Sequence, residues 1–387
     1  MKEYSITNVD IVLPNGIKKN ASIFVQDGII MDINNKIGGE VIDGEGLLLA
    51  PGFIDMHIHG AGGFGSDLNI EEDNLYSMAS FLESKGITTF QLTSSCDLKF
   101  LSRVEDILNR SSYIRDHISG IYFEGPFISE EKKGGLPLDS IRSVDIGYLE
   151  EILSIRRDGR SLVRTMTIAP ELKNIDKVIE KLSEADVLIA FGHSMATYED
   201  VKRFNHAHIT HLYNAQRGLD HKKAGLALLP FMNDEVTYEL ICDGVHVDLD
   251  LVSFTIKKAG YKNMCLISDG MSFCGLGKGD GIYLERDIYS DGKACYYKDN
   301  NVLIGSGLLI SDTGAALVNS GTITREELIS IASANPARVL HLNNLGVIKK
   351  GATADLILLD GENRVKRVFK AIDPGINLLK ESSCCCI

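Results

Sequence analysis

The feature that most limits the fold of this sequence is a serial alternation of short apolar runs with longer amphipathic stretches. Apolar runs rich in Val, Ile and Leu, separated by stretches such as LKFLSRVEDILNR (98–110), are typical of buried parallel strands in βαβ units. An open doubly wound sheet is the alternative, but no GxGxxG follows the first run. Eight runs in series predict a (β/α)8 TIM-like barrel, and they are LLLAPGFIDMHIH (47–59), ITTFQLTS (87–94), GIYFEGPF (120–127), LVRTMTIAPE (162–171), VLIAFGHS (187–194), HITHLYNA (208–215), YELICDGVH (238–246) and MCLISDG (264–270).

Both ends of the chain carry shorter strand patterns with Asn-Gly and Asp-Gly turn signals. The late strands GVIKKGATADLILLD (346–360) and RVKRVFKAI (364–372) have patterns that suit pairing with the N-terminal strands. We therefore predict an α/β protein in which residues 51–345 form the barrel. Residues 1–50 plus 346–387 are expected to form a small β-sandwich domain, and a β-hairpin insertion is expected near residues 280–305.

Charge and composition exclude several classes of protein. The net charge of −13 disfavours nucleic-acid and anionic-membrane partners, so any phosphate group must be held by a local basic patch. No run approaches the ~18 apolar residues of a membrane span, and the N-terminus has no secretory pattern. The 8 cysteines suit a reducing compartment, which predicts a cytoplasmic protein. The tail ESSCCCI (381–387) is compatible with lipidation, but we interpret it as a frayed terminus with reduced thiols.

Ionisable side chains gather at the C-terminal ends of the predicted strands. Barrel enzymes place their active sites at this end, so the side chains are expected to share one mouth. Burial of so many ionisable groups would cost several kcal/mol unless they have partners. The seven residues are His57, His59, Glu124, His193, His211, His246 and Asp269.

These residue types favour a metal site. His57 and His59 are two apart on a strand and share a face, so both imidazoles can reach one ion. Imidazole and carboxylate ligands without thiolate suit Zn²⁺, Fe²⁺, Co²⁺ or Mn²⁺, and we expect zinc first. Such an ion lowers the pKa of a bound water to ~7, and Asp269 is placed to take its proton and return it to a leaving nitrogen. The sequence has no GxSxG elbow and no evident Cys–His pair, so the pattern indicates hydrolysis of an amide-like bond without a covalent intermediate.

At this point a family resemblance rests on identifiable motifs. The chain resembles the amidohydrolase superfamily, and within it the N-acetylglucosamine-6-phosphate deacetylases. EGPF, GHS and HLYNA together are specific to this branch, in which a glutamate stands where many other amidohydrolases use a carboxylated lysine. The matching stretches occur in the family's order and span nearly the whole chain: PGFIDMHIHGAGG (51–63), YFEGPF (122–127), GHS (192–194), THLYNA (210–215), CDGVHVD (242–248), ISDGM (267–271), GSGL (305–308), and NPAR with GATADLILLD between 335 and 360.

The resemblance implies a role for each matching residue. Glu124, His193 and His211 would bind the principal metal, and His57 and His59 would complete a second site bridged by Glu124. One or two divalent ions per chain are therefore expected. Asp269 would be the general base and then the general acid, and it is also counted among the metal ligands. The residues assigned to substrate binding are His246, Asn214, Ala215, Lys222, Gly135, Leu136 and Leu308.

The implied activity is hydrolysis of the acetamide of N-acetylglucosamine 6-phosphate by a homodimer. Two departures from the family pattern bear on the substrate. Leu136 stands where the family usually has a histidine, so Lys132, Lys133 or a water must replace that group, or the acyl sugar differs. Lys222 aligns with a phosphate-binding arginine that often reaches across a dimer interface. Another N-acyl hexosamine phosphate, such as N-acetylgalactosamine 6-phosphate, and a non-catalytic amidohydrolase-like binding protein are the alternatives.

Overall fold

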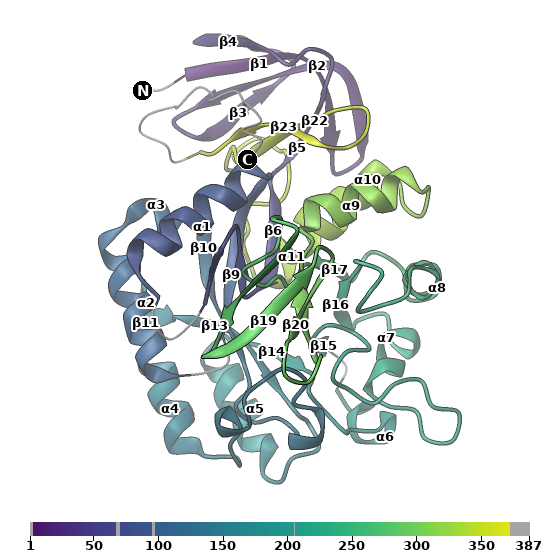
Figure 1. Cartoon of the computed structure of the whole chain (residues 1–387). Helices are drawn as coiled ribbons and strands as arrows, with labels where there is room; N and C mark the ends of the chain where they lie inside the picture. The colour runs from purple at the N-terminus through teal and green to yellow at the C-terminus, as the bar shows by residue number, and fades with distance from the viewer. Residues whose placement is uncertain (1–2, 67–69, 95–96, 205, 372–387) are drawn as a thin grey trace.

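The computed structural model describes residues 3–66, 70–94, 97–204 and 206–371, and its central element is the predicted barrel (Figure 1). Asp269 N–H donates to the His57 carbonyl at 2.9 Å, and this contact joins the last strand to the first at the C-terminal end. The (β/α)8 prediction is therefore confirmed. Eight parallel strands follow one another in chain order: β6 (Phe53–Ile58), β9 (Ile87–Ser94), β10 (Ile118–Glu124), β13 (Val163–Ile168), β14 (Leu188–Phe191), β15 (His208–Ile209), β16 (Thr237–Ile241) and β17 (Met264–Ile267).

Helices cover the outside of the barrel strands. α2 illustrates the reason, because its buried residues recur at helical spacing and the Asp97 side chain accepts the Lys99 N–H at its N-terminus. A π-helical turn, Ser330–Ala334, links the last two helices. The helices are α1 (Glu72–Ser84), α2 (Leu98–Arg110), α3 (Ser112–His117), α4 (Ile146–Ser154), α5 (Ile175–Glu184), α6 (Tyr198–Val201), α7 (Leu229–Met232), α8 (Leu249–Ala259), α9 (Ile310–Asn319), α10 (Arg325–Ile329) and α11 (Asn335–Val339).

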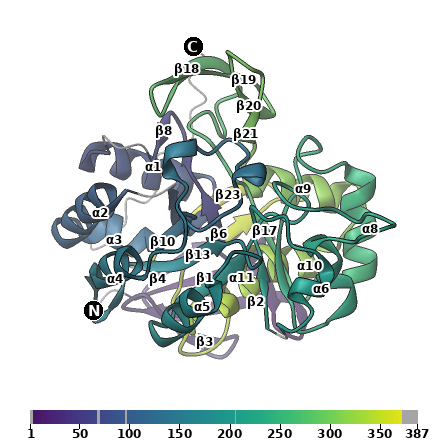
Figure 2. The same ribbon diagram turned by 90° about the horizontal axis from the view of Figure 1, so that it is seen from below.

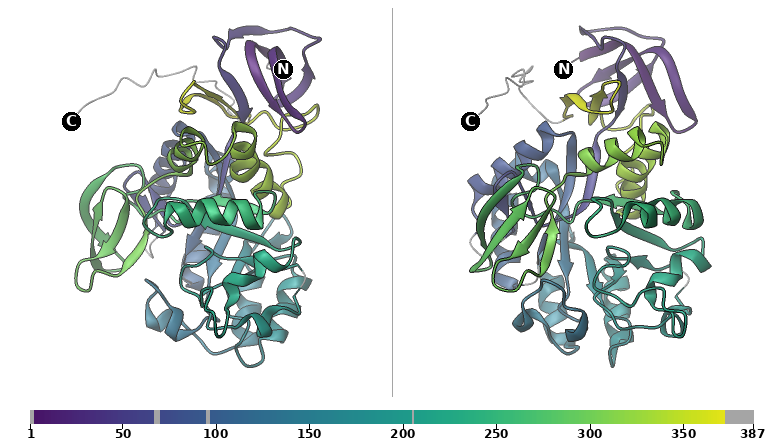
Figure 3. Two further views of the ribbon diagram at one scale, coloured as in Figure 1. Left: turned by 90° about the vertical axis from the view of Figure 1, so that its right-hand side faces the viewer. Right: turned by 45° about the vertical axis from the view of Figure 1, so that its right-hand side comes forward.

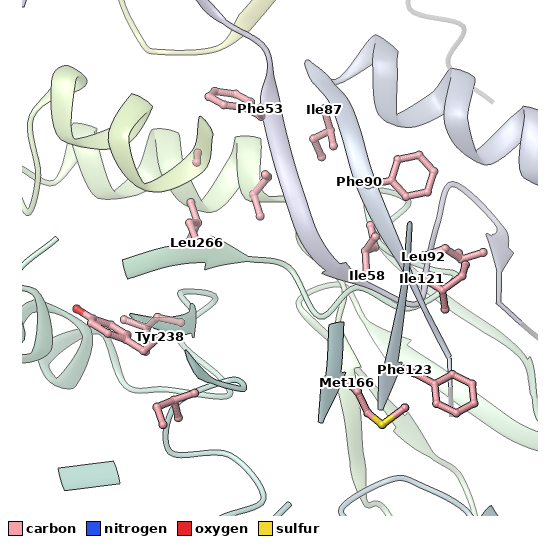
Figure 4. Close-up of a cluster of buried hydrophobic side chains, with 14 of the residues drawn as sticks. Phe53, Ile58, Ile87, Phe90, Leu92, Ile121, Phe123, Met166, Tyr238 and Leu266 are labelled. Atoms are coloured by element: carbon pink, nitrogen blue, oxygen red, sulfur yellow. The ribbon is translucent and has the colours of Figure 1, made fainter. Parts of the chain in front are cut away.

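Alternate residues of the barrel strands serve two different environments. Phe90, Leu92, Ile121 and Phe123 belong to the large apolar core on the helical side (Figure 4). The residues between them are polar and face the barrel interior. Interior hydrogen bonds join Thr165 to Gln91 at 2.8 Å, and Thr167, Tyr122 and Thr210 to one another at 3.0–3.2 Å. The strand period thus supplies a packed outer core and a hydrogen-bonded polar layer within the barrel.

Strands from both ends of the chain share one seven-stranded sheet, so the expected small β domain from the two termini is confirmed (Figure 1). β22 pairs antiparallel with β5 and brings the C-terminal part of the chain onto the N-terminal part. The C-terminal cysteines, Cys384 to Cys386, lie outside the described residues. The strands are β1 (Glu3–Leu13), β2 (Gly16–Gln26), β3 (Ile29–Ile33), β4 (Glu40–Asp43), β5 (Leu48–Pro51), β22 (Leu356–Leu359) and β23 (Val365–Phe369).

The apolar run 47–59 is not one strand, and its assignment as a single strand was wrong. β5 belongs to the terminal sheet and β6 to the barrel, with Gly52 between them. A Cβ on Gly52 would lie 2.2 Å from the Thr88 Oγ1, so the chain passes too close to β9 for any side chain. Apolar continuity hid this change of sheet, because both segments are buried.

A four-stranded antiparallel sheet follows β17 and projects from one side of the barrel (Figures 2 and 3). Its strands are β18 (Lys278–Tyr283), β19 (Arg286–Asp291), β20 (Ala294–Tyr297) and β21 (Leu303–Ser306). The Tyr297 hydroxyl donates to the Gly135 carbonyl at 3.0 Å, which ties this sheet to the loop after β10. Within the part of the chain that the structure describes, the helices are too short or too polar to cross a bilayer.

A candidate metal centre in the barrel mouth

Six ionisable side chains meet at the C-terminal ends of the barrel strands. They form two groups of three, and the ligand atoms within each group lie within 4.8 Å of one another. All six residues are buried, with exposed fractions of at most 9%. The first group is Glu124, His193 and His211, and the second is His57, His59 and Asp269.

The first group is drawn together around one carboxylate oxygen. Glu124 Oε1 lies 2.8 Å from the His193 Nε2 and 3.0 Å from the His211 Nε2. The two Nε2 atoms are themselves 3.0 Å apart. His193 Nδ1 faces the Lys132 carbonyl at 2.7 Å, so Nδ1 carries a proton and Nε2 is the ring nitrogen that faces the group.

The second group lies on the other side of Glu124. The His59 Nε2 is 3.4 Å from both Glu124 Oε2 and Asp269 Oδ1. The His57 Nε2 is 3.5 Å from Asp269 Oδ1 and 3.7 Å from Glu124 Oε1. Glu124 therefore faces both groups, which is the geometry expected of a ligand that bridges two ions.

Three of these residues occupy an uncommon backbone conformation. The φ angles of His193, His211 and Asp269 are 46°, 25° and 51°, in the left-handed region that residues other than glycine rarely adopt. Each residue follows the end of its strand, where the chain turns across the mouth. Backbone strain of this kind, worth about 1–3 kcal/mol per residue, is found most often at functional sites.

The electrostatics of the site favour a bound cation. Burial alone would raise the pKa of Glu124, but opposite charge and hydrogen bonds from His193 and His211 hold it well below its usual range. Burial likewise opposes ionisation of Asp269, and the His59 and His57 imidazoles lower its pKa. Burial of the His57 imidazole would lower its pKa, but the nearby carboxylate of Glu239 raises this pKa to about 10. The carboxylates therefore demand nearby positive charge, supplied by either protons or metal ions.

The donor atoms also fit a divalent metal ion. His57 Nε2 is buried and has no hydrogen-bond partner among the described residues. The distance from this atom to Asp269 Oδ1 is 3.5 Å, which is longer than a usual N–H···O hydrogen bond of about 2.7–3.2 Å. The distances of 3.4 Å from the His59 Nε2 to Glu124 and Asp269 are also longer than this range. Two ligands at about 2.1 Å from a tetrahedral zinc ion lie about 3.4 Å from each other. Imidazole nitrogens and carboxylate oxygens without thiolate match Zn²⁺ or another first-row divalent ion.

A pocket opens onto the two groups and collects most of the predicted substrate residues. His246 enters it with its Nδ1 2.7 Å from Asp243 Oδ2, an interaction that orients the ring. Of the residues predicted from the sequence, the pocket is lined by His59, Glu124, Gly135, Leu136, His193, His211, Asn214, Ala215, His246 and Asp269. His57 lies behind this surface, fully buried.

Two predicted substrate residues lie away from the pocket lining. Lys222 is exposed, and its backbone N–H donates to Asp220 Oδ1 at 2.8 Å. Leu308 is half-buried, with its N–H on the Ser306 hydroxyl at 3.1 Å. Lys133, one of the groups named as a replacement for the absent histidine, is engaged elsewhere, since its ammonium donates to the Leu136 carbonyl at 3.2 Å.

Sequence reasoning missed two sets of residues around the site. Tyr283, Leu303 and Ile304 of the inserted sheet line the pocket, and a strand pattern alone does not tell where an insertion will pack. Glu239 and His208 lie beneath the two groups, fully buried or nearly so. A carboxylate within the apolar run YELIC (238–242) was the available signal for Glu239.

The sequence is similar to known proteins along most of its length. Residues 48–381 match the model of the amidohydrolase family, which is most of the chain. An N-acetylglucosamine-6-phosphate deacetylase of Lysinibacillus sphaericus is 28% identical over 376 residues, covering 95% of this chain and 96% of its own. An N-acetylgalactosamine-6-phosphate deacetylase of Escherichia coli O157:H7 is 27% identical over 354 residues, covering 89% of this chain and 92% of its own.

A solved structure agrees with these matches. The N-acetyl-D-glucosamine-6-phosphate deacetylase of Mycobacterium smegmatis, as a variant in complex with N-acetyl-D-glucosamine 6-phosphate, superposes with a TM-score of 0.86. It is 25% identical, and the match covers 96% of this chain and 98% of that one.

Proposed function

Because the chain belongs to the amidohydrolase family, we propose that it is a metal-dependent deacetylase of N-acetylglucosamine 6-phosphate. The reaction adds water across the acetamide and gives glucosamine 6-phosphate and acetate. The observation that carries this proposal is the pair of ligand groups that share Glu124 at one pocket. The names of the relatives described above, which this chain matches along most of its length, support the choice of substrate.

Glu124, His193 and His211 would hold one divalent ion, and His57, His59 and Asp269 would hold a second with Glu124 between them. The proposed metal is zinc, with iron, cobalt and manganese as alternatives. A divalent ion in this site supplies a water that is nucleophilic near neutral pH and polarises the amide carbonyl.

Asp269 is the proposed proton carrier of the reaction. Its carboxylate lines the pocket and is ionised, because the His59 and His57 imidazoles outweigh the effect of burial on its pKa. As a water oxygen bonds to the acetyl carbon, Asp269 takes the proton from that water. The same proton then passes to the amide nitrogen, the carbon–nitrogen bond breaks, and acetate and the free amine are released.

The remaining pocket residues would bind the sugar and its phosphate. Asp243 occupies the Nδ1 of His246, so Nε2 is the ring atom left to bond a substrate oxygen. The turn at Asn214 and Ala215 is the proposed phosphate contact. Lys222 is exposed and outside the pocket lining, which suits a phosphate contact made across a homodimer interface. The proposed substrate contacts also include Gly135, Leu136 and Leu308.

A second substrate is favoured by Leu136, whose buried apolar side chain lines the pocket and cannot donate a hydrogen bond. An N-acyl hexosamine phosphate of different stereochemistry, such as N-acetylgalactosamine 6-phosphate, is therefore the alternative. The relative of that name is nearly as similar to this chain as the glucosamine enzyme, at 27% against 28% identity.

Acetate release from a panel of sugars tests the proposal. The purified protein, loaded in turn with zinc, cobalt, iron or manganese, is assayed with both N-acetylhexosamine 6-phosphates and with unphosphorylated N-acetylglucosamine. Faster turnover of one phosphorylated sugar identifies the substrate. Equal turnover with and without phosphate would refute the phosphate contact, and no turnover by the metal-loaded protein would favour a non-catalytic binding protein.

We also propose a cellular location and a division of the chain into domains. We propose a cytoplasmic location from the cysteine content of the sequence. We also retain residues 51–345 as the barrel domain, with residues 1–50 plus 346–387 as the β domain. Pairing of β5 with β22, and the change of sheet at Gly52, support this division.

A further inference from the structure

We infer that Glu239 is a positioning residue that fixes the proton and the ring orientation of His57, and thereby sets the cation affinity of the group His57, His59 and Asp269. Glu239 does not line the pocket, and it contacts the two ligand groups only through His57 and His211. It rests on the metal centre of the proposed function.

Glu239 has no route to the substrate. It lies at the middle of β16, its exposed fraction is 0%, and it is absent from the pocket lining. The Oε2 atom accepts the His211 N–H at 2.9 Å and faces the His57 Nδ1 at 3.0 Å. The Oε1 atom faces the His208 Nε2 at 3.2 Å. With both oxygens engaged by the protein, the carboxylate can act only through these partners.

The contact with His57 determines which ring nitrogen carries the proton. An ionised carboxylate only accepts hydrogen bonds, so Nδ1 of His57 is the protonated nitrogen. Nε2 lies on the opposite side of the ring, where it faces Asp269 and Glu124, and it is the ring nitrogen left to bind a metal ion. Carboxylates that orient metal-binding histidines in this way are a general feature of metal sites.

Glu239 is itself held in place from a neighbouring strand. His208 on β15 faces it with Nε2, while the His208 Nδ1 lies 2.7 Å from the Thr237 Oγ1. The carboxylate is thus clamped between β15, β16 and β6. It also accepts the backbone N–H of His211, so one buried charge supports a ligand in each of the two groups. A buried carboxylate is costly without such partners, and these three contacts offset that cost.

The test is a cobalt titration of the metal-free full chain, followed by visible absorption and by metal analysis. In the Glu239→Gln variant we expect affinity for the second ion to fall by about 10–100-fold, the usual effect of losing such a carboxylate. The first ion, at Glu124, His193 and His211, should bind nearly as before, because Glu239 contacts that group only through the backbone N–H of His211, which a glutamine oxygen in the place of Oε2 can still accept. The same oxygen can still face the His57 Nδ1, so the weaker binding of the second ion would measure the loss of the negative charge beside that ring. Glu83→Gln is the matched control, since Glu83 Oε2 faces the His117 Nε2 at 2.8 Å on α1 and α3, away from the pocket.

A double-mutant cycle separates positioning from a general loss of stability. In a His57→Gln background, adding Glu239→Gln should not weaken the second ion further, because the proposed effect passes through His57. A further loss of similar size in that background would overturn the inference. Glu239→Asp gives a second measurement if the glutamine variant folds poorly, because it keeps the charge but withdraws it from His57. Wild-type affinity for the second ion in either folded variant would also overturn it.

Failure of this inference is distinguishable from failure of the proposed function. A wild-type protein that binds no divalent ion would refute the metal centre itself. A wild-type protein that binds two ions and deacetylates its substrate, with variants that bind the second ion equally well, would refute only the role of Glu239.

Discussion

Replacement of Asp269 by asparagine is the most direct perturbation of the proposed chemistry, because the structure predicts that little else changes. Asp269 has a φ of 51°, and asparagine is one of the few residues that tolerates this region well. Its backbone N–H donates to the His57 carbonyl at 2.9 Å and closes the barrel independently of the side chain. The asparagine Oδ1 can still face His57 and His59, so metal should remain bound.

The amide cannot accept and return a proton. Loss of general acid–base catalysis costs about 10²–10⁴-fold in rate, or about 3–5 kcal/mol in the activation barrier. We therefore expect kcat for acetate release to fall by that factor, with metal content and melting temperature near those of the wild type. Asp145→Asn is the control, because Asp145 accepts the backbone N–H of Tyr148 at the start of α4 and lies outside the pocket lining.

Two outcomes would contradict this reasoning. Turnover close to that of the wild type, with metal retained, would remove Asp269 from its role as proton carrier. Loss of turnover and metal together would show that Asp269 serves chiefly as a ligand, and the proton would have to move through another group in the pocket.

Three further perturbations follow from the geometry. Chelation of the bound ion should lower the melting temperature, since a ligand present at 100 times its Kd stabilises the fold by about 2.7 kcal/mol; unchanged melting of a protein shown to have lost its metal would refute this. Gly135→Ala should raise KM for the sugar phosphate, because its Cβ would lie 2.8 Å from the Ile304 Cγ2 and force the pocket wall apart; Gly218→Ala, which meets nothing within 4 Å, is the control. Glu83→Gln should lower the free energy of unfolding near pH 7 by about 1–2 kcal/mol, measured by urea denaturation. Burial opposes ionisation of Glu83, but the hydrogen bond from His117 lowers its pKa, so this contribution is present above the unfolded pKa of about 4.3 and is lost as the pH falls through the folded value; a constant difference down to acid pH would contradict the assignment.

Local patterns predicted the barrel because each barrel strand carries its own signal. Apolar residues such as Phe90 and Leu92 recur on the outer face of β9. Each amphipathic helix between two strands can likewise be predicted from its own residues. The division of residues 47–59 between two sheets was predicted only through the domain boundary between residues 50 and 51, because β5 and β6 are both fully buried and the apolar run continues through both. The approach of Thr88 to Gly52 shows where the chain leaves one sheet for the other.

Candidate site residues were predictable where chemistry and strand position coincided. His193 and His211 stand directly after apolar runs, and the barrel rule brings such ends together. Glu239 was not predicted, although it contacts residues of both ligand groups, because the sequence around a single carboxylate in a strand does not indicate which residues it will contact. Tyr283 and Ile304 were missed because an insertion can pack on any side of the mouth.

The sequence by itself determined the order of strands and helices, the closed cylinder they form, and the identity of the imidazoles and carboxylates at its rim. These properties follow from short-range periodicity and from the chirality of βαβ connections, which leave few alternatives. Only the tertiary structure decided that Glu239 contacts residues of both ligand groups and that Lys222 lies outside the pocket lining. Such relations depend on side-chain distances between residues up to 182 positions apart, as for His57 and Glu239, and no local pattern encodes a distance across the barrel.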